Sequence, residues 1–306
     1  MQTEIDRLLE SILKTQQTLG EETFPLSPKV LSDFLKNEHA VLEEDFDRDF
    51  CTVPTGGATE QIVSVPSSVP SNFPQTALHT SEAQTSSDDF GIPPVVTLPS
   101  GTKAEQWAWL KEKVLSCPNC LRHVPEGRKP VFGSGNLDAE IFFCGEAPGA
   151  EEEEQGEVFV GRAGQLLTKI IEAMGLQRSE VYIGNIMNWR PETPNRIGNR
   201  PPTQEEMRFC LPYLIGQVKI VRPKVLVALG LTAVNGLLGY DANRKMRDCR
   251  GHWFEFHQIS LLVTYHPSYL LRNGTSAAKR MVWEDMLCVM KFLKMPISEK
   301  QEGYFL

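Results

Sequence analysis

Apolar residues fall in short continuous runs through the last two thirds of the chain, and segments with helical spacing separate these runs. Four runs contain consecutive apolar residues, which is typical of strands buried on both faces; they lie at 139–144, 181–185, 224–230 and 259–265. Residues 252–257 predict one more strand. Helices are predicted at 104–116 and 163–174, from Thr203 onwards, directly after 230, and at 276–293. This alternation predicts an α/β fold, a three-layer α/β/α arrangement around a mostly parallel central sheet.

The first hundred residues have a different pattern. Residues 1–50 carry apolar positions at helical spacing, and Ser27-Pro28 predicts the start of a second short helix. We interpret them as an acidic arm with short amphipathic helices; the alternative is a helix pair that binds an unknown protein. Residues 51–101, rich in Pro, Ser and Thr, predict a disordered linker. A folded domain is expected at 102–296, followed by a tail at 297–306.

Charge is distributed unevenly along the 306 residues. The whole chain has a net charge of -8, but residues 1–100 hold 16 acidic and 5 basic residues, and residues 101–306 carry a net charge of +3. The acidity of the whole chain therefore does not exclude a nucleic-acid partner for the folded part. The sequence contains no apolar run of about 18 residues and no secretion signal, which predicts a cytoplasmic protein with no membrane contact. In that compartment the seven cysteines are thiols or metal ligands rather than disulfides.

Two predicted strands end in residues suited to a ligand site. The strand at 139–144 leads into the turn Gly145–Gly149, and the strand at 259–265 is followed directly by His266. An open α/β sheet binds its ligand at the carboxyl ends of such strands, where turns feed helix N-termini. We therefore expect the two loops to share one cleft. No Lys-Ser/Thr pair follows the glycine turn and no GxGxxG is present, which argues against a nucleotide-binding enzyme.

These motifs resemble those of the family 4 uracil-DNA glycosylases. The resemblance runs from about Trp107 to Leu293, and the segments that carry it, in order, are Gly145–Gly149, Phe159–Leu167, Val181–Asn185, Arg190-Pro191, Asn199-Arg200, Arg222–Lys224 and His266–Asn273. It implies an enzyme that flips uracil out of single- or double-stranded DNA and cleaves its N-glycosidic bond, in base excision repair. The alternative is a non-catalytic nucleic-acid-binding module on the same fold.

Breaking this bond leaves a uracil anion and a positively charged sugar, which indicates the groups that the site needs. His266 is the candidate donor to the uracil O2, Asn185 can pair with O4 and N3–H, and Phe159 can stack on the base. The alternatives are a core histidine, a turn asparagine and a core phenylalanine. By resemblance, Glu146 and Glu152 are catalytic and Ala147 binds uracil, although the run Glu151–Glu154 is also typical of a solvated loop. Ala147 stands where other glycosylase families carry a catalytic aspartate.

Leu270, Leu271 and Arg272 follow the histidine. An apolar residue here could wedge into the stack that the flipped base leaves, with Arg272 on a phosphate. The alternative is the buried start of a helix. DNA containing uracil is the expected partner, bound by a monomer.

The resemblance also implies a [4Fe-4S] cluster held by four cysteines. Three of them are present, Cys117, Cys120 and Cys210, but Trp189 stands at the fourth position, immediately before Arg190-Pro191. A cluster normally needs four thiolates. Another residue such as Cys249 could complete the site, Zn²⁺ could bind instead, or the site could be empty with Trp189 filling the space. We favour no intact cluster, and no cofactor is needed for the chemistry. Cys144 and Cys288 are predicted core residues.

Overall fold

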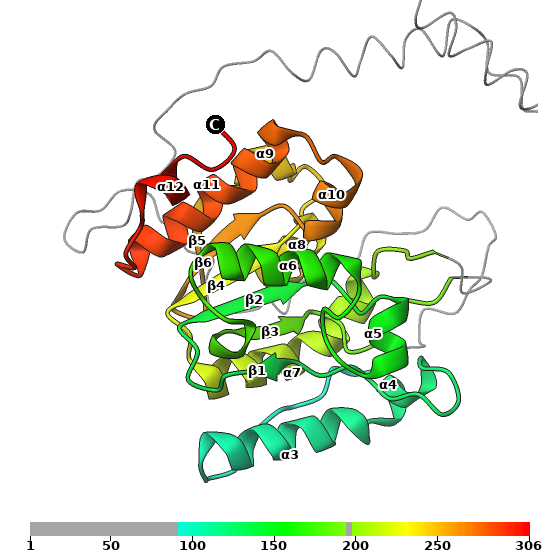
Figure 1. The fold of residues 1–306 in the computed structure, drawn as a ribbon. Helices are drawn as coiled ribbons and strands as arrows, with labels where there is room; N and C mark the ends of the chain where they lie inside the picture. Colours follow the sequence, from blue (N-terminus) through cyan, green and yellow to red (C-terminus); the bar gives the residue numbers. More distant parts are fainter. Residues whose placement is uncertain (1–90, 194–197) are drawn as a thin grey trace, which may run out of the picture. The chain divides into compact units, whose positions relative to one another are not determined.

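The computed structural model describes residues 91–193 and 198–306, and Figure 1 shows their arrangement. The predicted acidic arm and most of the predicted linker lie outside the described residues. Val96 and Leu98, near the end of the predicted linker, pack against the hydrophobic core. Gln106 also donates a hydrogen bond to the carbonyl of Pro99 at 2.8 Å. Packing onto the domain therefore begins several residues before Thr102.

Within these residues the central sheet has six strands in the order β1-β3-β2-β4-β6-β5. Four neighbouring strands are parallel: β3 (Tyr182–Asn185), β2 (Ile141–Gly145), β4 (Val225–Leu229) and β6 (Ile259–Thr264). The edge strands β1 (Ser134–Gly135) and β5 (Trp253–Phe256) are antiparallel to their neighbours. The prediction of a mostly parallel sheet is confirmed, while the two-residue strand β1 was not predicted.

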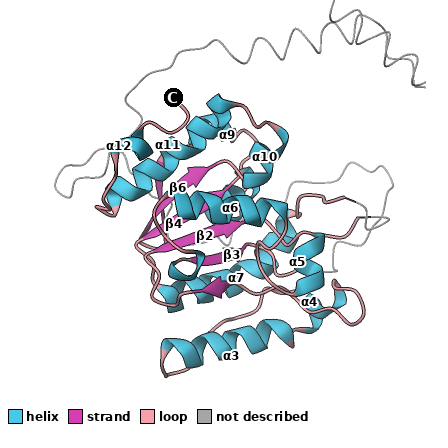
Figure 2. Ribbon diagram, in the orientation of Figure 1, coloured by secondary structure: helices cyan, strands magenta, loops and turns pink. Residues whose placement is uncertain are grey.

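Helices cover both faces of the sheet (Figure 2). On one face lie α3 (Lys103–Leu115), α7 (Gln204–Val221) and α8 (Leu231–Leu238), and on the other lie α6 (Arg162–Ala173) and α11 (Ser276–Phe292). Strand β2 shows why the apolar runs are continuous. Phe142 and Cys144 belong to the first core, and Ile141 and Phe143 belong to the second. Because successive strand residues point to opposite faces, a strand covered on both sides needs apolar residues at every position.

Local signals set the helix ends. Thr203 accepts a hydrogen bond from the backbone N–H of Glu206, whose carboxylate accepts one from the N–H of Thr203. The helix predicted from Thr203 onwards therefore begins with a capping box. Helix α7 ends at Arg222, in the left-handed conformation, just before Pro223. The remaining helices are short: α4 (Pro118–Arg122), α5 (Ala150–Gln155), η1 (Arg178–Glu180), α9 (Met246–Cys249), α10 (Pro267–Arg272) and α12 (Glu299–Glu302).

The predicted tail at 297–306 contacts α11. The Trp283 indole donates to the carbonyl of Gln301 at 2.5 Å, and Arg280 donates to the carbonyls of Glu302 and Tyr304. The ring of Tyr304 lies 5.1 Å from that of Trp283. No helix in the described ranges combines the length and the apolar character needed to cross a lipid bilayer.

Candidate active site

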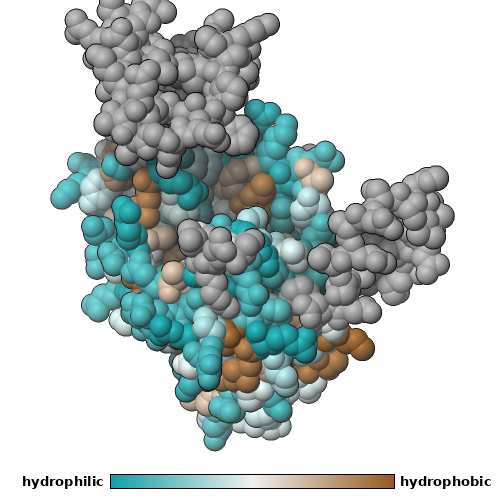
Figure 3. Space-filling view, turned by 90° about the vertical axis from the view of Figure 1, so that its right-hand side faces the viewer, coloured by the Kyte–Doolittle hydropathy of each residue, from teal (hydrophilic) through white to brown (hydrophobic). Residues whose placement is uncertain are grey.

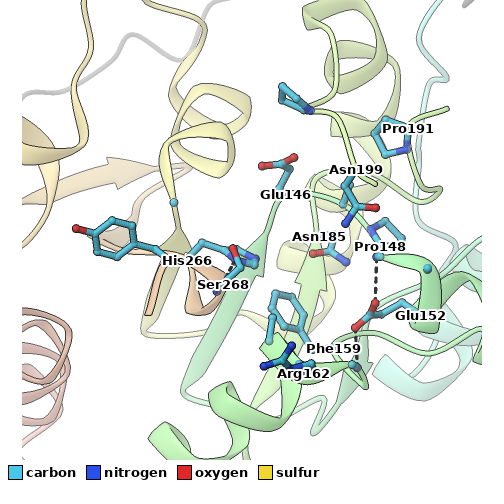
Figure 4. Close-up of a pocket in the computed structure, with 18 of the residues that line it drawn as sticks. Glu146, Pro148, Glu152, Phe159, Arg162, Asn185, Pro191, Asn199, His266 and Ser268 are labelled. Atoms are coloured by element: carbon cyan, nitrogen blue, oxygen red, sulfur yellow. Dashed lines mark hydrogen bonds between the residues drawn. The ribbon is translucent and has the colours of Figure 1, made fainter. Parts of the chain in front are cut away.

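The carboxyl ends of the parallel strands open into one pocket of about 720 Å³. Gly145 at the end of β2 is the register partner of Asn185 at the end of β3, and Thr264 at the end of β6 pairs with Leu229 of β4. The lining includes Glu146, Ala147, Glu152, Phe159, Asn185 and His266. Figure 4 shows Phe159, Asn185 and His266 around the same space. The structure thus brings together all six residues assigned to catalysis and uracil binding from the sequence.

Figure 3 shows the face of the molecule onto which these strands point, where hydrophilic side chains predominate and smaller groups of apolar side chains lie between them. Arg162, Asn199, Arg200 and Arg272 belong to the pocket lining. Arg162 and Arg272 are exposed. The exposed guanidinium groups lie in a lining that also contains three glutamates.

Gly145 allows Asn185 and Phe159 to approach each other closely. A Cβ atom built on Gly145 would lie 2.4 Å from the Asn185 Oδ1 and 2.5 Å from the Phe159 Cζ, so no larger residue fits without moving one of them. The Asn185 side chain is 4 % exposed, and its Oδ1 has no hydrogen-bond partner among the described residues. A buried polar atom without a partner costs about 1–3 kcal/mol. The amide at the pocket wall therefore has the geometry of a group that completes its hydrogen bonding with a ligand.

The backbone of Phe159 adopts a rare conformation and is in close contact with helix α6. Its φ angle is 51°, in the left-handed region that non-glycine residues rarely adopt. A Cβ on Gly164 would lie 1.8 Å from the carbonyl oxygen of Phe159, so helix α6 can pack against this backbone only with glycine there. The Phe159 ring lies 5.8 Å from the His266 imidazole, centroid to centroid, with 34° between the planes. The ring therefore faces the pocket as a platform beside the imidazole.

His266 is the N-cap of α10, and its hydrogen bonds define its tautomer. The Nδ1 accepts a hydrogen bond from the backbone N–H of Ser268 at 3.1 Å and lies 2.8 Å from the Ser268 Oγ. Because a backbone N–H can only donate, Nδ1 is the unprotonated nitrogen, and in the neutral ring Nε2 carries the proton. Burial, with a smaller contribution from the charge of Arg272, lowers the pKa of His266 to about 4. The imidazole is therefore neutral at pH 7 and has an N–H to donate.

Glu152 links two loops through its carboxylate. Its Oε2 accepts from the N–H of Gly149 at 3.1 Å, and its Oε1 accepts from the N–H of Gly161 at 2.9 Å. The residue is 9 % exposed, and its neighbour Glu153, 8 % exposed, lies 3.5 Å from the Arg190 guanidinium. Glu151 and Glu154 are exposed, as expected of a solvated segment, while Glu152 and Glu153 are buried. The run forms α5, whose inward residues bind backbone N–H groups and an arginine.

Glu146 directly follows strand β2 and lies at the rim opposite Phe159 (Figure 4). Burial raises its pKa, while a hydrogen bond with Thr232 and the charge of Arg272 act in the opposite direction. Arg272 is thus close enough to influence both Glu146 and His266. The carboxyl group, the guanidinium and the imidazole form one electrostatic group at the pocket mouth.

The three residues predicted to contact DNA differ in their exposure. Leu270 is 7 % exposed and packs with Ala278 and Val282, so it belongs to the core and is not available as a wedge. Leu271 is 41 % exposed, and Arg272 is also exposed. The prediction for Leu270 is corrected in favour of the buried start of a helix, because the inward face of α10 packs on α6 and α11.

Asn199 is a pocket residue that the sequence did not single out. Its Oδ1 accepts from the Arg190 Nε at 2.9 Å, and the Arg190 Nη2 donates to the carbonyl of Gly198. Because an arginine side chain only donates, the amide oxygen must face it and the amide NH₂ points away. Asn199 lines the pocket near Gly149. The pair Arg190-Pro191 and the dipeptide Asn199-Arg200 were noted as motifs, but only the fold places them against each other.

The predicted cluster ligands show a different environment. Cys117 and Cys120 are hydrogen-bonded to each other, which lowers the pKa of Cys117 to about 5, and Cys210 interacts electrostatically with both. Trp189, at the fourth position, is 1 % exposed, and its ring stacks 4.9 Å from that of His123 at 19°. In the described part of the chain, no group of three or more His, Cys, Asp or Glu side chains is arranged to hold a metal ion. These residues do not fit a four-thiolate cluster.

The other cysteines lie in the core. Cys144 and Cys288 are buried, as predicted. Cys288 is disulfide-bonded, so the expectation that none of the cysteines forms a disulfide was wrong. Cys249, the candidate completing ligand, is also buried, and its thiol donates to the carbonyl of Lys245 at 3.2 Å. Neither the three-cysteine metal site nor a site completed by Cys249 has geometric support in the structure.

An aromatic ring, an amide and a neutral imidazole thus share one pocket at the carboxyl edge of a parallel sheet. Comparison with known proteins identifies the family. The profile of the Uracil DNA glycosylase superfamily matches residues 132–287. The chain belongs to this superfamily, on its type-4 branch.

Three relatives give the range of similarity. The type-4 uracil-DNA glycosylase of Thermotoga maritima is 40 % identical over 197 residues, which cover 63 % of this chain and 97 % of that protein. The type-4 enzyme of Pyrobaculum aerophilum is 39 % identical over 170 residues, 54 % of this chain and 84 % of its own length. The type-5 uracil-DNA glycosylase of Thermus thermophilus is 28 % identical over 179 residues, 53 % of this chain and 78 % of its own length.

Proposed function

We propose that this protein excises uracil from DNA by hydrolysing the N-glycosidic bond and leaves an abasic site. The observation that carries the proposal is the shared pocket of Phe159, Asn185 and His266, which supplies stacking, edge recognition and a donor in one place. The names of the relatives support the same activity. The target base must leave the duplex to reach this pocket, and the exposed Arg162 and Arg272 of its lining suit the phosphates on either side.

Recognition of uracil is assigned to Phe159 and Asn185. The base stacks on the phenylalanine ring, and the asparagine amide donates to O4 and accepts from N3–H. Cytosine presents an amino group and an unprotonated N3 at the same positions, which the amide oriented for uracil mismatches. The buried Oδ1 without a protein partner supports this role, because a ligand N–H would satisfy it.

The departing base is stabilised by His266. As the glycosidic bond lengthens, negative charge grows on the uracil O2, and the Nε2–H of the neutral imidazole donates to it. The Ser268 N–H on Nδ1 fixes the tautomer that this step requires. A neutral donor does not have to lose a proton to uracil, so the base leaves as an anion.

Hydrolysis needs a water molecule near the sugar. Each oxygen of Glu152 accepts one backbone N–H and keeps a lone pair that can orient water. Glu146 adds a carboxyl group at the rim, near the face where the sugar becomes positive. Ala147 leaves space and provides no acid. Leu271 and Arg272, both exposed beside the pocket, are assigned to the DNA backbone and the vacated stack. The monomeric state stays a prediction.

The activity is tested with an oligonucleotide that contains one uracil, treated with alkali after incubation and resolved on a gel. The wild-type protein should give the cleaved strand without added metal or nucleotide. Replacing His266 by alanine should lower the single-turnover rate roughly 10²- to 10³-fold, the effect of losing one oxyanion donor. The matched control is His252→Ala, which removes an exposed histidine. No abasic product from the wild-type protein would contradict the proposal, and an unchanged His266→Ala rate would remove His266 from the mechanism.

The recognition role is tested with Asn185→Asp. A carboxylate cannot donate to O4, so uracil excision should fall and release of cytosine from a G·C or single-stranded substrate should rise relative to it. Full uracil activity with no gain in cytosine release would show that Asn185 does not read the base edge.

A further inference from the structure

A buried ion pair lies behind the strand that leads to His266. Asp285 of α11 is 1 % exposed. Arg250 directly follows α9. Its guanidinium donates to both carboxylate oxygens of Asp285, with Nη2 at 2.8 Å from Oδ1 and Nε at 3.3 Å from Oδ2. The same Nη2 donates to the carbonyl of Met281 at 2.6 Å. The pair therefore joins α11 to the turn that precedes β5.

The ion pair also holds the end of the strand that precedes the imidazole. The hydroxyl of Thr264, the last residue of β6, donates to the Asp285 Oδ2 at 2.6 Å. The carbonyl of Thr264 accepts from the N–H of Gly230 at 2.8 Å. Thr264 is thus fixed through its side chain by α11 and through its backbone by the turn after β4, two residues before His266.

Tyr265, between Thr264 and His266, packs against Arg250 and Tyr269. The Arg250 guanidinium lies 5.9 Å from the centre of its ring, and Tyr269 stacks against that ring at 4.4 Å and 14°. Both tyrosines line the pocket. A Cβ on Gly230 would come within 3.0 Å of the His266 Cβ, so the turn after β4 closes the remaining side. These contacts hold the segment 264–266 through α11, through Arg250 and through the turn after β4.

Burying an ion pair in a core costs free energy, because both charges lose their hydration. Burial raises the pKa of Asp285 to about 7 although Arg250 and Thr264 act to lower it, which shows how unfavourable the site is for a charge. Apolar residues of similar volume often stabilise a protein as well as, or better than, such a pair. They would not provide the directional hydrogen bond to Thr264 or the cation above Tyr265. The arrangement therefore suits the fixing of one geometry better than it suits stability.

We propose that Asp285 and Arg250 are positioning residues that act through Thr264 and Tyr265 to hold the His266 imidazole where it can donate to the leaving uracil. This inference rests on the proposed function. Neither residue lines the pocket, and neither was singled out in the sequence. A shift of about 1 Å in a reacting group can cost roughly 10²-fold in rate, so the effect of losing the pair is measurable.

The test uses full-length protein with two substitutions that preserve volume, Thr264→Val and Asp285→Asn. Single-turnover rates are measured on matched oligonucleotides that carry uracil or 5-fluorouracil, whose electron-withdrawing fluorine makes the departing anion more stable. A displaced donor harms the poorer leaving group more. We expect the uracil rate to fall roughly 10-fold in Thr264→Val and roughly 10²-fold in Asp285→Asn. The ratio of 5-fluorouracil to uracil rates should rise in both, in the direction that His266→Ala produces.

The matched control is Glu284→Gln, which removes a neighbouring ion pair on the same helix, with Arg280 at 2.8 Å, away from the pocket. Partial unfolding would lower both rates equally and leave their ratio unchanged. A constant ratio in Thr264→Val and Asp285→Asn therefore overturns the inference. Uracil excision by the wild-type protein would still stand in that case. The second measurement, independent of turnover, is the ¹⁵N spectrum of His266. Thr264→Val should change its tautomer balance or its pKa, and identical imidazole signals in wild type and variant also count against the inference. Failure of the wild-type protein to release uracil would refute the proposed function itself, and the spectrum would still test the positioning.

Discussion

The pocket and the cysteine region, which consists of Cys117, Cys120, Cys210 and Trp189, differ in how their polar groups are satisfied. In the pocket, the Asn185 Oδ1 is buried without a partner among the described residues and the His266 Nε2–H faces a cavity. In the cysteine region, the thiols interact with one another and the Trp189 ring stacks on His123. The first region borders a cavity of about 720 Å³, and in the second region the side chains pack against one another. A resemblance in sequence therefore has to be examined site by site.

The largest effect that would sharpen this comparison is expected at Trp189. Removing a fully buried tryptophan leaves a cavity, so Trp189→Ala should lower the free energy of unfolding by about 3–5 kcal/mol. Urea denaturation measures the loss. Trp109→Ala is the control, because Trp109 is only half-buried and should cost less. A loss at Trp189 no larger than that at Trp109 would show that its packing does not hold the region together.

Iron content tests the same region directly. Because the fourth ligand position holds an indole, purified protein should lack the broad visible absorbance of an iron–sulfur cluster. Metal analysis of protein purified without oxygen gives the number of iron atoms per chain. An iron content of about four atoms per chain, together with that absorbance, would contradict the closed packing and restore the cluster that the family resemblance implies.

The pH dependence of stability tests the burial of His266. Its pKa is about 4 in the folded protein and 6.5 in the unfolded chain, so the unfolded chain binds the proton first as pH falls. The wild-type protein should therefore lose stability between pH 6.5 and 4, by about 3 kcal/mol from this residue. His266→Gln lacks the penalty, so the difference in unfolding free energy between the two proteins should shift in favour of the variant across this range. A difference that is constant with pH would show that the imidazole is solvated.

The smallest of these effects, roughly 10²-fold in rate or about 2.7 kcal/mol, is expected from Gly145→Ala. The added methyl group must displace the Asn185 amide or the Phe159 ring. Single-turnover excision should fall with little change in the affinity for DNA. Gly156→Ala is the control for loss of a glycine, because a Cβ there meets no atom within 4 Å, although its positive φ adds some strain to the turn after α5. Equal rates in the two variants would show that the pocket wall can relax.

The sequence predicted the parts of the fold that depend on repeated local patterns. The four parallel strands appear as continuous apolar runs because both faces are buried, and α7 begins at its capping box. Strand β1 has two residues and no pattern to detect. Helix α5 was missed because its run of glutamates looks solvated in sequence, whereas Glu152 binds a backbone N–H group brought in from another loop.

The same limit applied to the pocket. Asn185 and His266 could be found because each ends a predicted strand. Asn199 could not be oriented without Arg190, and Leu270 could not be separated from Leu271 until the face of α10 that packs inward was known. Thr264 ends β6, Asp285 lies in α11 and Arg250 follows α9, so only tertiary structure joins them.

The contact between Trp283 and residues 301–304 provides an intrinsic optical reporter. The indole is 3 % exposed, donates to the Gln301 carbonyl and touches the Tyr304 ring. If this last segment detached, the indole would enter water and its fluorescence emission would move to longer wavelength. Detachment at the carboxyl-terminal end could thus be followed in real time while catalysis is monitored separately.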